Sequence, residues 1–421
     1  MKHFAFLAIW PLIGAFAQIP ELKVEIPLKH VAVAAMSPPL PGSLTSGPSL
    51  VLTTFYPFGE DGVYYLPDAA KLGQAGADLT LRVIDNTTVK WPNQANPALA
   101  NSIPHADTTI VTAGGFFVSP SKSTGSVDLF DVANFPDVKH TKVSEDKKGN
   151  FYHHTEWLDV NGDGRMDIVG ARCFKSSINP FSSPEGQLVW FEQPANPGDP
   201  WTTGVLAEGP DVAFTPVDLD SNGQTQFAVT QFFTKQQLAI YSCQHSSWLQ
   251  CANNTDVSSV VVDKSDGPFF NVQWVDLNND GKKELLATTN EADGKGAVYA
   301  YEQPANWQTD PWVKHQLATG YKPKNAFLPG QGAPGSATAF DLFIGPTGKP
   351  ASSSPYIMVS GDDMGIVDIL APTGSAFEYN KIRIVNSTGT VGSPTFYNQK
   401  GQPTQLFIPL FAENKLGVFS F

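Results

Sequence analysis

The sequence predicts an all-β fold built from seven copies of one unit, and three observations lead to this prediction. The first is an aspartate-rich segment that recurs, as WLDVNGDGRMDIVGAR from Trp157, PVDLDSNGQTQFAVTQ from Pro216 and WVDLNNDGKKELLATT from Trp274. The leading aspartates of these segments are 59 and 58 residues apart, a period typical of repeat architectures. The second is the composition, because 36 Gly, 34 Pro and only 16% charged residues suit many short strands joined by turns. The third is the length, since residues 18–421 span close to seven periods.

Fainter copies extend the period in both directions. SLVLTTFYPF and DTTIVTAGGFF lie upstream, and FDLFIGPTGKPASSSPYIMVSGDD and TFYNQKGQPTQLFIPLFAEN lie downstream. Four-stranded antiparallel units that cannot bury both faces alone are stabilised by radial closure. The sequence therefore predicts a seven-bladed β-propeller as a single domain over residues 18–421, with LKVEIPL from Leu22 completing the last blade.

The strand order within a blade follows from the clearest copy. Its four strands are expected to be FFNVQWVDL, ELLATTN, AVYAYEQ and WVKHQLA, with the aspartate-rich loop between the first two. Because consecutive strands are antiparallel, these loops share one face of the disc. The connections between second and third strands lie on the other face, where we expect the ligand chemistry.

Residues 1–17 resemble a secretory signal peptide, with Lys2 and His3 before an apolar run that ends in Ala-Phe-Ala. Sequons at Asn86, Asn253 and Asn386 agree with a secreted glycoprotein. The net charge of −13 argues against nucleic acid and anionic membranes as partners, and we expect a monomer. In an oxidising compartment Cys243 and Cys251 are close enough to pair, which leaves Cys173 as a buried small residue.

Two of the aspartate-rich loops carry the ligands of a structural Ca²⁺ site. Side-chain oxygens at relative positions 1, 3, 5 and 9, with a backbone carbonyl at position 7, suit this hard cation. The predicted ligands are Asp159, Asn161, Asp163, Arg165 and Asp167 in one loop, and Asp276, Asn278, Asp280, Lys282 and Glu284 in the other. The loop at Asp218 has amides in place of two acids and predicts a weaker site.

The candidate catalytic residues lie in the blade of Asp159. Its first strand begins with FYHHT, which is expected to bring Tyr152, His153 and His154 toward the axis. The long connection after its second strand carries Arg172 and Lys175. Such groups in one concavity suit proton transfer beside an anion-binding group. The alternative is that the histidine pair only hydrogen-bonds to adjacent blades.

Other candidates come from neighbouring connections. Tyr56, Lys122 and Asp362 are predicted to contact substrate together with Lys175, and Lys235, Glu291 and Asp363 lie in equivalent connections. His105 lies in the degraded loop of the second unit, so it belongs either to the face of the aspartate-rich loops or, because of the insertions before it, to the axis.

The segments DVNGDGRMDIV, DLDSNGQTQFAV and DLNNDGKKELLAT resemble the FG-GAP/VCBS repeats of integrin-type and secreted microbial propellers. Among secreted fungal members, GFFVSPSKSTGSVDLF and FYHHTEWLDVNGDG resemble patterns of the L-rhamnose-α-1,4-D-glucuronate lyases and, more distantly, of the propeller part of aldos-2-ulose dehydratase. The resemblance to the lyases implies a secreted polysaccharide lyase that releases rhamnose from rhamnosyl-glucuronate ends of arabinogalactan by β-elimination.

An elimination of this kind needs a base, a group that stabilises the enolate-like charge, and an acid for the departing oxygen. Arg172 would hold the uronate carboxylate, His154 and Tyr152 would exchange the proton, and His153 or His105 would be the reserve acid. A non-catalytic glycan-binding propeller is the competing hypothesis, and it predicts aromatic platforms at equivalent positions of several blades. A dehydratase would need a metal site that these residues do not assemble, and an integrin-like adhesion module would need additional domains.

Overall fold

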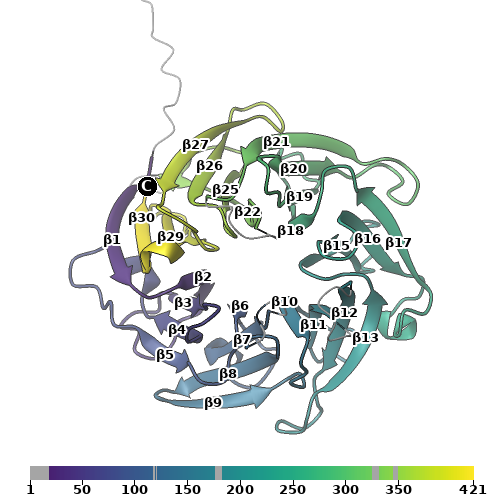
Figure 1. Cartoon of the computed structure of the whole chain (residues 1–421), viewed down its shortest axis with the longest axis horizontal. Coiled ribbons are helices and arrows are strands. Elements are labelled where there is room, and N and C mark those ends of the chain that lie inside the picture. The colour runs from purple at the N-terminus through teal and green to yellow at the C-terminus, as the bar shows by residue number, and fades with distance from the viewer. Residues whose placement is uncertain (1–18, 117–118, 120, 176–182, 325–330, 345–348) are drawn as a thin grey trace, which may run out of the picture.

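A computed structural model describes residues 19–116, 119, 121–175, 183–324, 331–344 and 349–421. Seven four-stranded antiparallel sheets surround a central axis, as Figure 1 shows. The predicted seven-bladed β-propeller is therefore confirmed. The predicted signal peptide, residues 1–17, lies outside the described residues.

Each blade runs from an inner to an outer strand. Blade 1 comprises β2 (Val31–Ser37), β3 (Ser49–Thr54), β4 (Gly62–Leu66) and β5 (Arg82–Asp85). Blade 2 comprises β6 (Pro92–Pro97), β7 (Thr109–Gly114), β8 (Val127–Asn134) and β9 (Asp137–Lys142). Blade 3 comprises β10 (Asn150–Leu158), β11 (Asp167–Phe174), β12 (Glu185–Glu192) and β13 (Thr202–Glu208). Blades 4 and 5 comprise β14 (Phe214–Val217), β15 (Gln226–Gln231), β16 (Gln237–Cys243) and β17 (Val257–Asp263); and β18 (Phe269–Val275), β19 (Glu284–Thr289), β20 (Gly296–Glu302) and β21 (Val313–Tyr321). Blades 6 and 7 comprise β22 (Ser336–Phe340), β25 (Tyr356–Ser360), β26 (Ile366–Pro372) and β27 (Tyr379–Asn386); and β28 (Thr395–Tyr397), β29 (Gln405–Leu410), β30 (Lys415–Ser420) and β1 (Glu21–Pro27).

The two ends of the chain close the ring. The N-terminal strand β1 pairs antiparallel with β30, in a register that places Glu21 opposite Ser420. The predicted completion of the last blade by the segment from Leu22 is thus confirmed. The small remaining elements are the hairpin of β23 (Phe343–Ile344) and β24 (Lys349–Pro350) and the 3₁₀ turns η1 (Ala69–Lys71), η2 (Ala106–Thr108), η3 (Trp248–Cys251) and η4 (Phe411–Glu413).

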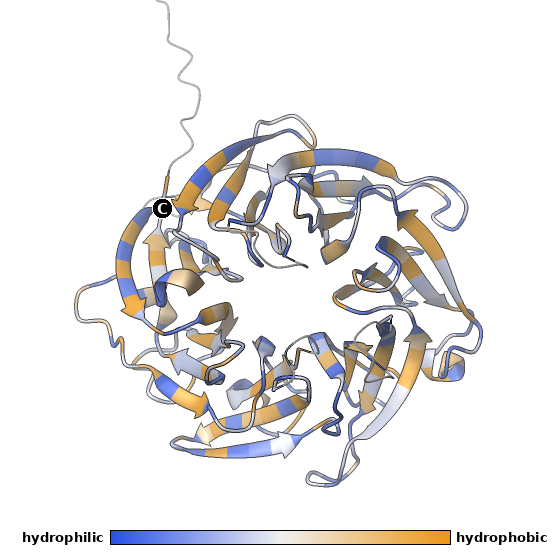
Figure 2. Ribbon diagram, viewed as in Figure 1, coloured by the Kyte–Doolittle hydropathy of each residue, from blue (hydrophilic) through white to orange (hydrophobic). Residues whose placement is uncertain are grey.

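The core lies between the blades. Second strands such as β3, β15 and β19 are buried along their whole length, because both faces of a blade pack against neighbouring blades. The outer strand β1 alternates between hydrophilic and hydrophobic residues, as Figure 2 shows. In the described part of the chain, buried apolar side chains form one cluster in each of the seven gaps between blades.

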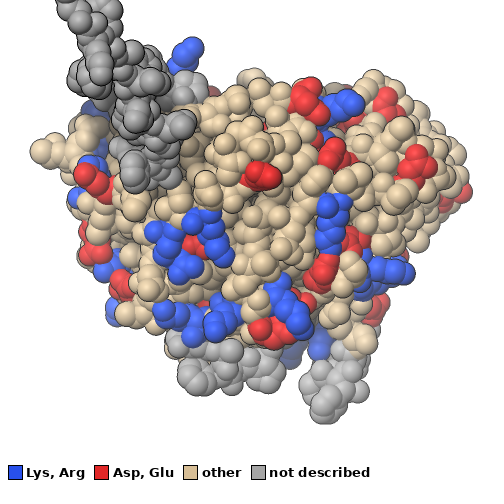
Figure 3. Space-filling model, turned by 90° about the horizontal axis from the view of Figure 1, so that it is seen from above, with Lys and Arg blue, Asp and Glu red and all other residues tan. Residues whose placement is uncertain are grey.

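The surface mixes charges of both signs. On the side of the disc seen in Figure 3, acidic and basic side chains are interspersed among uncharged ones. Among the described residues, no helix is long and apolar enough to cross a bilayer. Cys243 and Cys251 form the predicted disulfide, and Cys173 is a buried free thiol.

Candidate functional site

The propeller has a hollow axis. A cavity of about 500 Å³, here called the mouth cavity, is lined by the connections between second and third strands and by the beginnings of the first strands. A second cavity of about 880 Å³ lies below it and is lined by first strands and the start of the loops that follow them. Both are lined by Val33, Asn93, His153, Asn271 and Ser393, so they form one channel.

A β-bulge in the first strand aims one residue into this channel in four blades. The register shifts at Ala32, Asn93, His153 and Phe270, and each of these residues lines the mouth cavity. A bulge leaves its extra residue unpaired and re-aims the side chain. In blade 3 the bulged residue is His153, which is how the fold places an imidazole on the channel wall.

Aromatic rings surround most of the mouth. Ring contacts run without a break from blade 7 through blades 1 to 5, with centroid separations from 4.4 Å for Phe55 and Trp91 to 6.2 Å for Phe55 and Phe411. We call these rings the aromatic mouth; its members are Phe55, Tyr56, Trp91, Phe116, Phe151, Phe232, Phe233, Phe270 and Phe411. Tyr56 joins the others through His30, whose ring centroid is 4.1 Å from that of Tyr56 and 5.4 Å from that of Phe411. Most of these rings are partly exposed, so they offer flat apolar faces to a ligand in the channel.

Two buried carboxylates hold the aromatic mouth in place. Asp211 is fully buried and accepts hydrogen bonds from the backbone N–H groups of Phe232, Phe233 and Thr234, at 2.7 to 2.9 Å. Asp61 accepts from the Trp91 N–H at 2.8 Å and from the Tyr56 N–H at 3.3 Å. The loops that present the rings are therefore fixed by hydrogen bonds and are preorganised for binding.

A pair of carboxyl groups from blade 6 interrupts the aromatic mouth. The Asp362 carboxylate accepts from Asn290 Nδ2 at 2.6 Å, and that of Asp363 accepts from the Gly332 N–H at 3.2 Å. Enclosure by the channel walls raises the pKa of both groups, and the charge of Asp363 raises the pKa of Asp362 further. The pair therefore keeps a proton above the usual range for aspartate, and it can both donate and accept hydrogen bonds.

Two of the three predicted catalytic histidines, His153 and His154, reach the channel. His153 packs edge-on against Phe270, with ring centroids 5.1 Å apart, and against Phe151 at 5.7 Å. Burial, and then the neighbouring His154, lower the pKa of His153 to about 3, so its imidazole is neutral. His154 lines the lower cavity, with Nε2 2.8 Å from Glu156 Oε1 and Nδ1 3.4 Å from Gln94 Nε2.

Tyr152 and Arg172 do not line the channel. Tyr152 is 1% exposed and packs in the apolar cluster between blades 2 and 3. Arg172 lies opposite Tyr152 on the paired strand; its guanidinium donates to Gln187 Oε1 and stands 5.6 Å from the ring centroid of Phe174. The alternation of side chains along β10 explains this separation, because neighbouring residues on a strand point to opposite faces.

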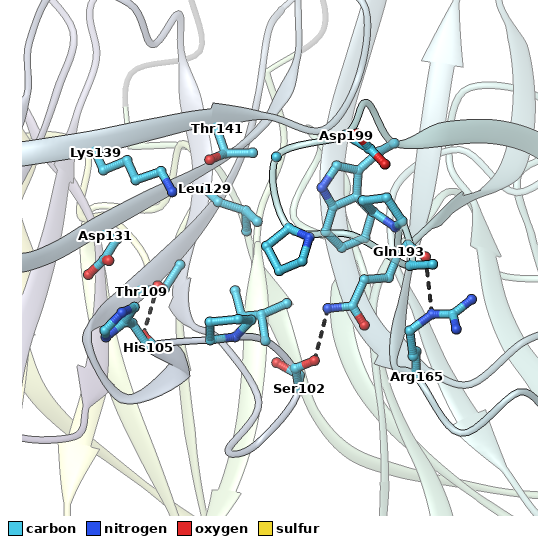
Figure 4. A pocket seen from close by; sticks show the side chains of 17 residues that line it. Ser102, His105, Thr109, Leu129, Asp131, Lys139, Thr141, Arg165, Gln193 and Asp199 are labelled. Carbon is cyan, nitrogen blue, oxygen red and sulfur yellow. Dashed lines mark hydrogen bonds between the residues drawn. The ribbon is translucent and has the colours of Figure 1, made fainter.

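His105 lies on the face of the aspartate-rich loops. It follows β6 in the first loop of blade 2, with a left-handed φ of 60°, just before η2. There it lines a third cavity, the rim cavity between blades 2 and 3, which Figure 4 shows. The structure thus separates His105 from His153 and His154.

The predicted substrate contacts also divide. Tyr56 and Asp362 line the mouth cavity, and Tyr56 stacks on His30 with ring centroids 4.1 Å apart. Lys122 is buried and donates from Nζ to Asp61 Oδ2 and to the Gly59 carbonyl, both at 2.8 Å, so it is committed to holding the mouth. Lys175 directly follows β11, and residues 176–182 of its connection lie outside the described residues.

The two predicted Ca²⁺ loops share one internal hydrogen-bond pattern. Asp159 accepts from Gly162 and Gly164 at 2.7 and 2.9 Å, and Asp276 accepts from Asn279 and Gly281 at the same distances. Burial, and then nearby carboxylates, raise the pKa of the acids that close the loops, to about 6 for Asp167 and about 7 for Glu284. Oxygen donors of this kind suit Ca²⁺. Within the described residues, however, no three His, Cys, Asp or Glu side chains are gathered as a metal site.

Sequence reasoning missed most of the aromatic mouth. Phe55, Phe232 and Phe411 directly follow the second strands of blades 1, 4 and 7, and Phe116 follows that of blade 2 after one glycine. An aromatic residue at this repeated position is a signal that the sequence does contain. It is also the feature expected of a glycan-binding propeller.

No protein-family model and no curated protein matches the chain. Among solved structures, a putative 6-phosphogluconolactonase from Bacteroides uniformis is 14% identical, with a TM-score of 0.45 over 84% of this chain and 86% of that one. A mutant α-L-arabinofuranosidase from Fusarium graminearum in complex with an iminosugar inhibitor is 12% identical, with a TM-score of 0.43 over 96% and 98% of the two chains. The GH93 α-L-arabinofuranosidase of Fusarium graminearum in complex with arabinobiose is 11% identical, with a TM-score of 0.41 over 95% and 97%. At these identities and TM-scores the matches bear on neither the activity nor the site of this chain.

Proposed function

We propose that the protein binds a glycan at the aromatic mouth of its channel. The observation that carries this proposal is the unbroken chain of rings around the mouth, faced by the Asp362 and Asp363 carboxyl groups. Aromatic faces pack against the C–H faces of sugar rings, and carboxyl groups bind sugar hydroxyls. A mouth cavity of about 500 Å³ is within the range of small-ligand sites and has room for a short oligosaccharide end.

The finer proposal is that the bound glycan contains a uronate and is cleaved by β-elimination. The observation that favours it is the geometry of the mouth cavity, which is lined by the His153 imidazole together with the Asp362 and Asp363 carboxyl groups. In the reaction His153 accepts the proton at C5, the electron pair of that C–H bond forms the C4–C5 double bond, and the C4–O bond breaks. Whichever of Asp362 and Asp363 carries the proton of the pair protonates the departing oxygen.

Arg172, Tyr152 and His105, for which catalytic roles were expected, do not line this cavity. Arg172 and Tyr152 lie between blades 2 and 3, and His105 lies on the other face. Elimination at the mouth therefore depends on His153 and the carboxyl pair. His154 remains on the channel wall below them.

The test uses the purified protein on an array of neutral and uronate-containing plant glycans, followed by product analysis. Binding should weaken when Trp91 or Phe270 is replaced by Ala, and Val261→Ala on the outside of blade 4 is the control. Appearance of the unsaturated-uronate absorbance that is lost in His153→Ala and Asp362→Asn supports elimination. Binding without any product leaves a glycan-binding propeller, and no binding by correctly folded protein overturns the proposal.

A further inference from the structure

The rim cavity has a volume of about 290 Å³ and is separate from the channel. It lies between blades 2 and 3 and shares no lining residue with the channel. Figure 4 shows His105, Asp131 and Lys139 on one side of it and Gln193, Arg165 and Asp199 on the other. It therefore cannot be an extension of the glycan site proposed above.

The chain contains a second copy of this interface, between blades 4 and 5. QPANPGDPW from Gln193 and QPANWQTDPW from Gln303 are two versions of one segment. In both, the glutamine side chain donates to a carbonyl in the first loop of the preceding blade, from Gln193 to Ser102 at 3.0 Å and from Gln303 to Leu219 at 2.7 Å. The two interfaces can therefore be compared position by position.

The copies differ at the fifth residue of the segment. In blade 5 this is Trp307, which is 4% exposed and donates from its indole N–H to Asp220 at 2.8 Å. In blade 3 it is Pro197, which lines the rim cavity. The chain itself thus shows that this kind of groove accepts a flat ring with a hydrogen-bond donor at its edge, and that blade 3 leaves the groove open.

The residues that line the open groove include hydrogen-bond acceptors. Ser102 and Gln193 are each 8% exposed, and within the described residues Ser102 Oγ and Gln193 Oε1 have no hydrogen-bond partner. Asp131 adds a carboxylate, of which Oδ1 accepts from the Thr108 hydroxyl at 2.8 Å. A buried acceptor without a partner is unfavourable, so a ligand with several O–H groups fits this floor better than an indole with one N–H.

The apolar wall suits the same ligand. Trp201 lines the cavity, is partly exposed, and is supported from behind by Trp157, with ring centroids 6.3 Å apart. An indole fixed in this way is a platform for the C–H face of a sugar ring. On the opposite side Lys139, an exposed residue of β9, can donate to a hydroxyl or ring oxygen.

We propose that the rim cavity binds one pyranose residue of a glycan. Trp201 stacks on the sugar ring, and Asp131 and the two buried acceptors accept hydrogen bonds from its hydroxyl groups. The site holds a glycan on the face of the disc opposite to the mouth, whatever the channel binds or cleaves.

Saturation-transfer NMR with a panel of methyl pyranosides tests this proposal on the full-length protein. Pro197→Trp, which gives blade 3 the residue of blade 5, should abolish transfer to the bound glycoside. Trp201→Ala should weaken binding roughly tenfold, the effect of losing one aromatic contact. Asp131→Asn keeps the shape and should also weaken binding. Val313→Trp, which adds the same side chain on the outside of blade 5, should change nothing.

Phe270→Ala separates this site from the channel. Glycoside signals that persist in Phe270→Ala and disappear in Pro197→Trp support the rim site, and signals lost only in Phe270→Ala overturn it. Should Pro197→Trp fail to fold, Trp201→Ala and Asp131→Asn decide the question, and unchanged affinity in both overturns the proposal. So does transfer to N-acetyltryptophanamide with none to any glycoside, since the groove would then take an aromatic side chain of a protein.

Discussion

Replacing Asp61 by Ala should destabilise the propeller strongly and loosen its mouth. Asp61 is 4% exposed, and its carboxylate is 2.8 Å from Lys122 Nζ. Removing one partner of a buried ion pair leaves an uncompensated charge and costs about 3–5 kcal/mol. Lys122 keeps one hydrogen bond, to the Gly59 carbonyl at 2.8 Å, so we expect the lower end of this range. Trp91 and Tyr56 also lose their backbone hydrogen bonds, and affinity for glycan should fall with stability.

The assay is urea unfolding followed by tryptophan fluorescence, for the wild type, Asp61→Ala, Lys122→Met and the double variant. If an unpaired ammonium causes the loss, the double variant should be more stable than Asp61→Ala alone. Asp61→Asn, which keeps acceptors for the backbone N–H groups, should fall between Asp61→Ala and the wild type. A loss below about 1 kcal/mol in Asp61→Ala, or a double variant that is less stable than either single variant, would show that the Asp61–Lys122 ion pair does not stabilise the fold in this way.

Three further predictions concern stability. If the loops at Asp159 and Asp276 bind Ca²⁺, then Ca²⁺ at about 100 times its Kd should stabilise the fold by about 2.7 kcal/mol per site. Asp276→Ala should remove the stabilisation by one of the two sites. A melting temperature that does not change when a chelator is added would exclude these sites. Because the folded-state pKa values of Asp362 and Asp363 are raised above their unfolded values, the native state binds more protons above about pH 4, and the free energy of unfolding should fall as pH rises from there through the raised values. Asp362→Asn should flatten this dependence, and an unchanged slope would contradict it. Replacing both Cys243 and Cys251 by Ser should cost about 2–3 kcal/mol, measured by denaturant unfolding, because the unfolded chain loses the constraint of a short loop; equal stability of the two proteins would refute this estimate.

The fold was predictable from sequence because a repeat reveals itself without any knowledge of contacts. The loops at Asp159 and Asp276 mark the same point of two blades, and the strands around them fall where the pattern places them. The closure by β1 followed from a count, since the last blade ends at Phe421 one strand short. Periodicity carries this information because each blade is one structural unit.

The channel was harder to predict, because two local rules compete in FYHHT. Strand alternation sends Tyr152 into the gap between blades, whereas a bulge of one residue turns His153 into the channel. Reading the whole run as facing the axis therefore groups residues that the fold separates. Arg172 points to the same face of the blade as Tyr152, because it lies opposite Tyr152 on the neighbouring strand.

The aromatic mouth is the part that sequence patterns hide best. Its rings are distributed from Phe55 to Phe411 and meet only when the ring of blades closes. The buried carboxylates that fix them, Asp61 and Asp211, resemble ordinary turn residues until their hydrogen bonds are seen. The sequence does repeat an aromatic residue after the second strand of several blades, but contacts between distant repeats have no fixed spacing along the chain, so this repeat does not show which rings meet.

A crystal structure of the wild-type protein soaked with an oligosaccharide from the best-binding array glycan would show whether the aromatic mouth is the glycan site. Sugar rings should stack on Trp91, Phe232 or Phe270, with a hydroxyl within hydrogen-bond distance of Asp362. A mouth cavity that holds only water at saturating oligosaccharide, with protein that binds the same glycan in solution, would contradict this placement of the glycan site.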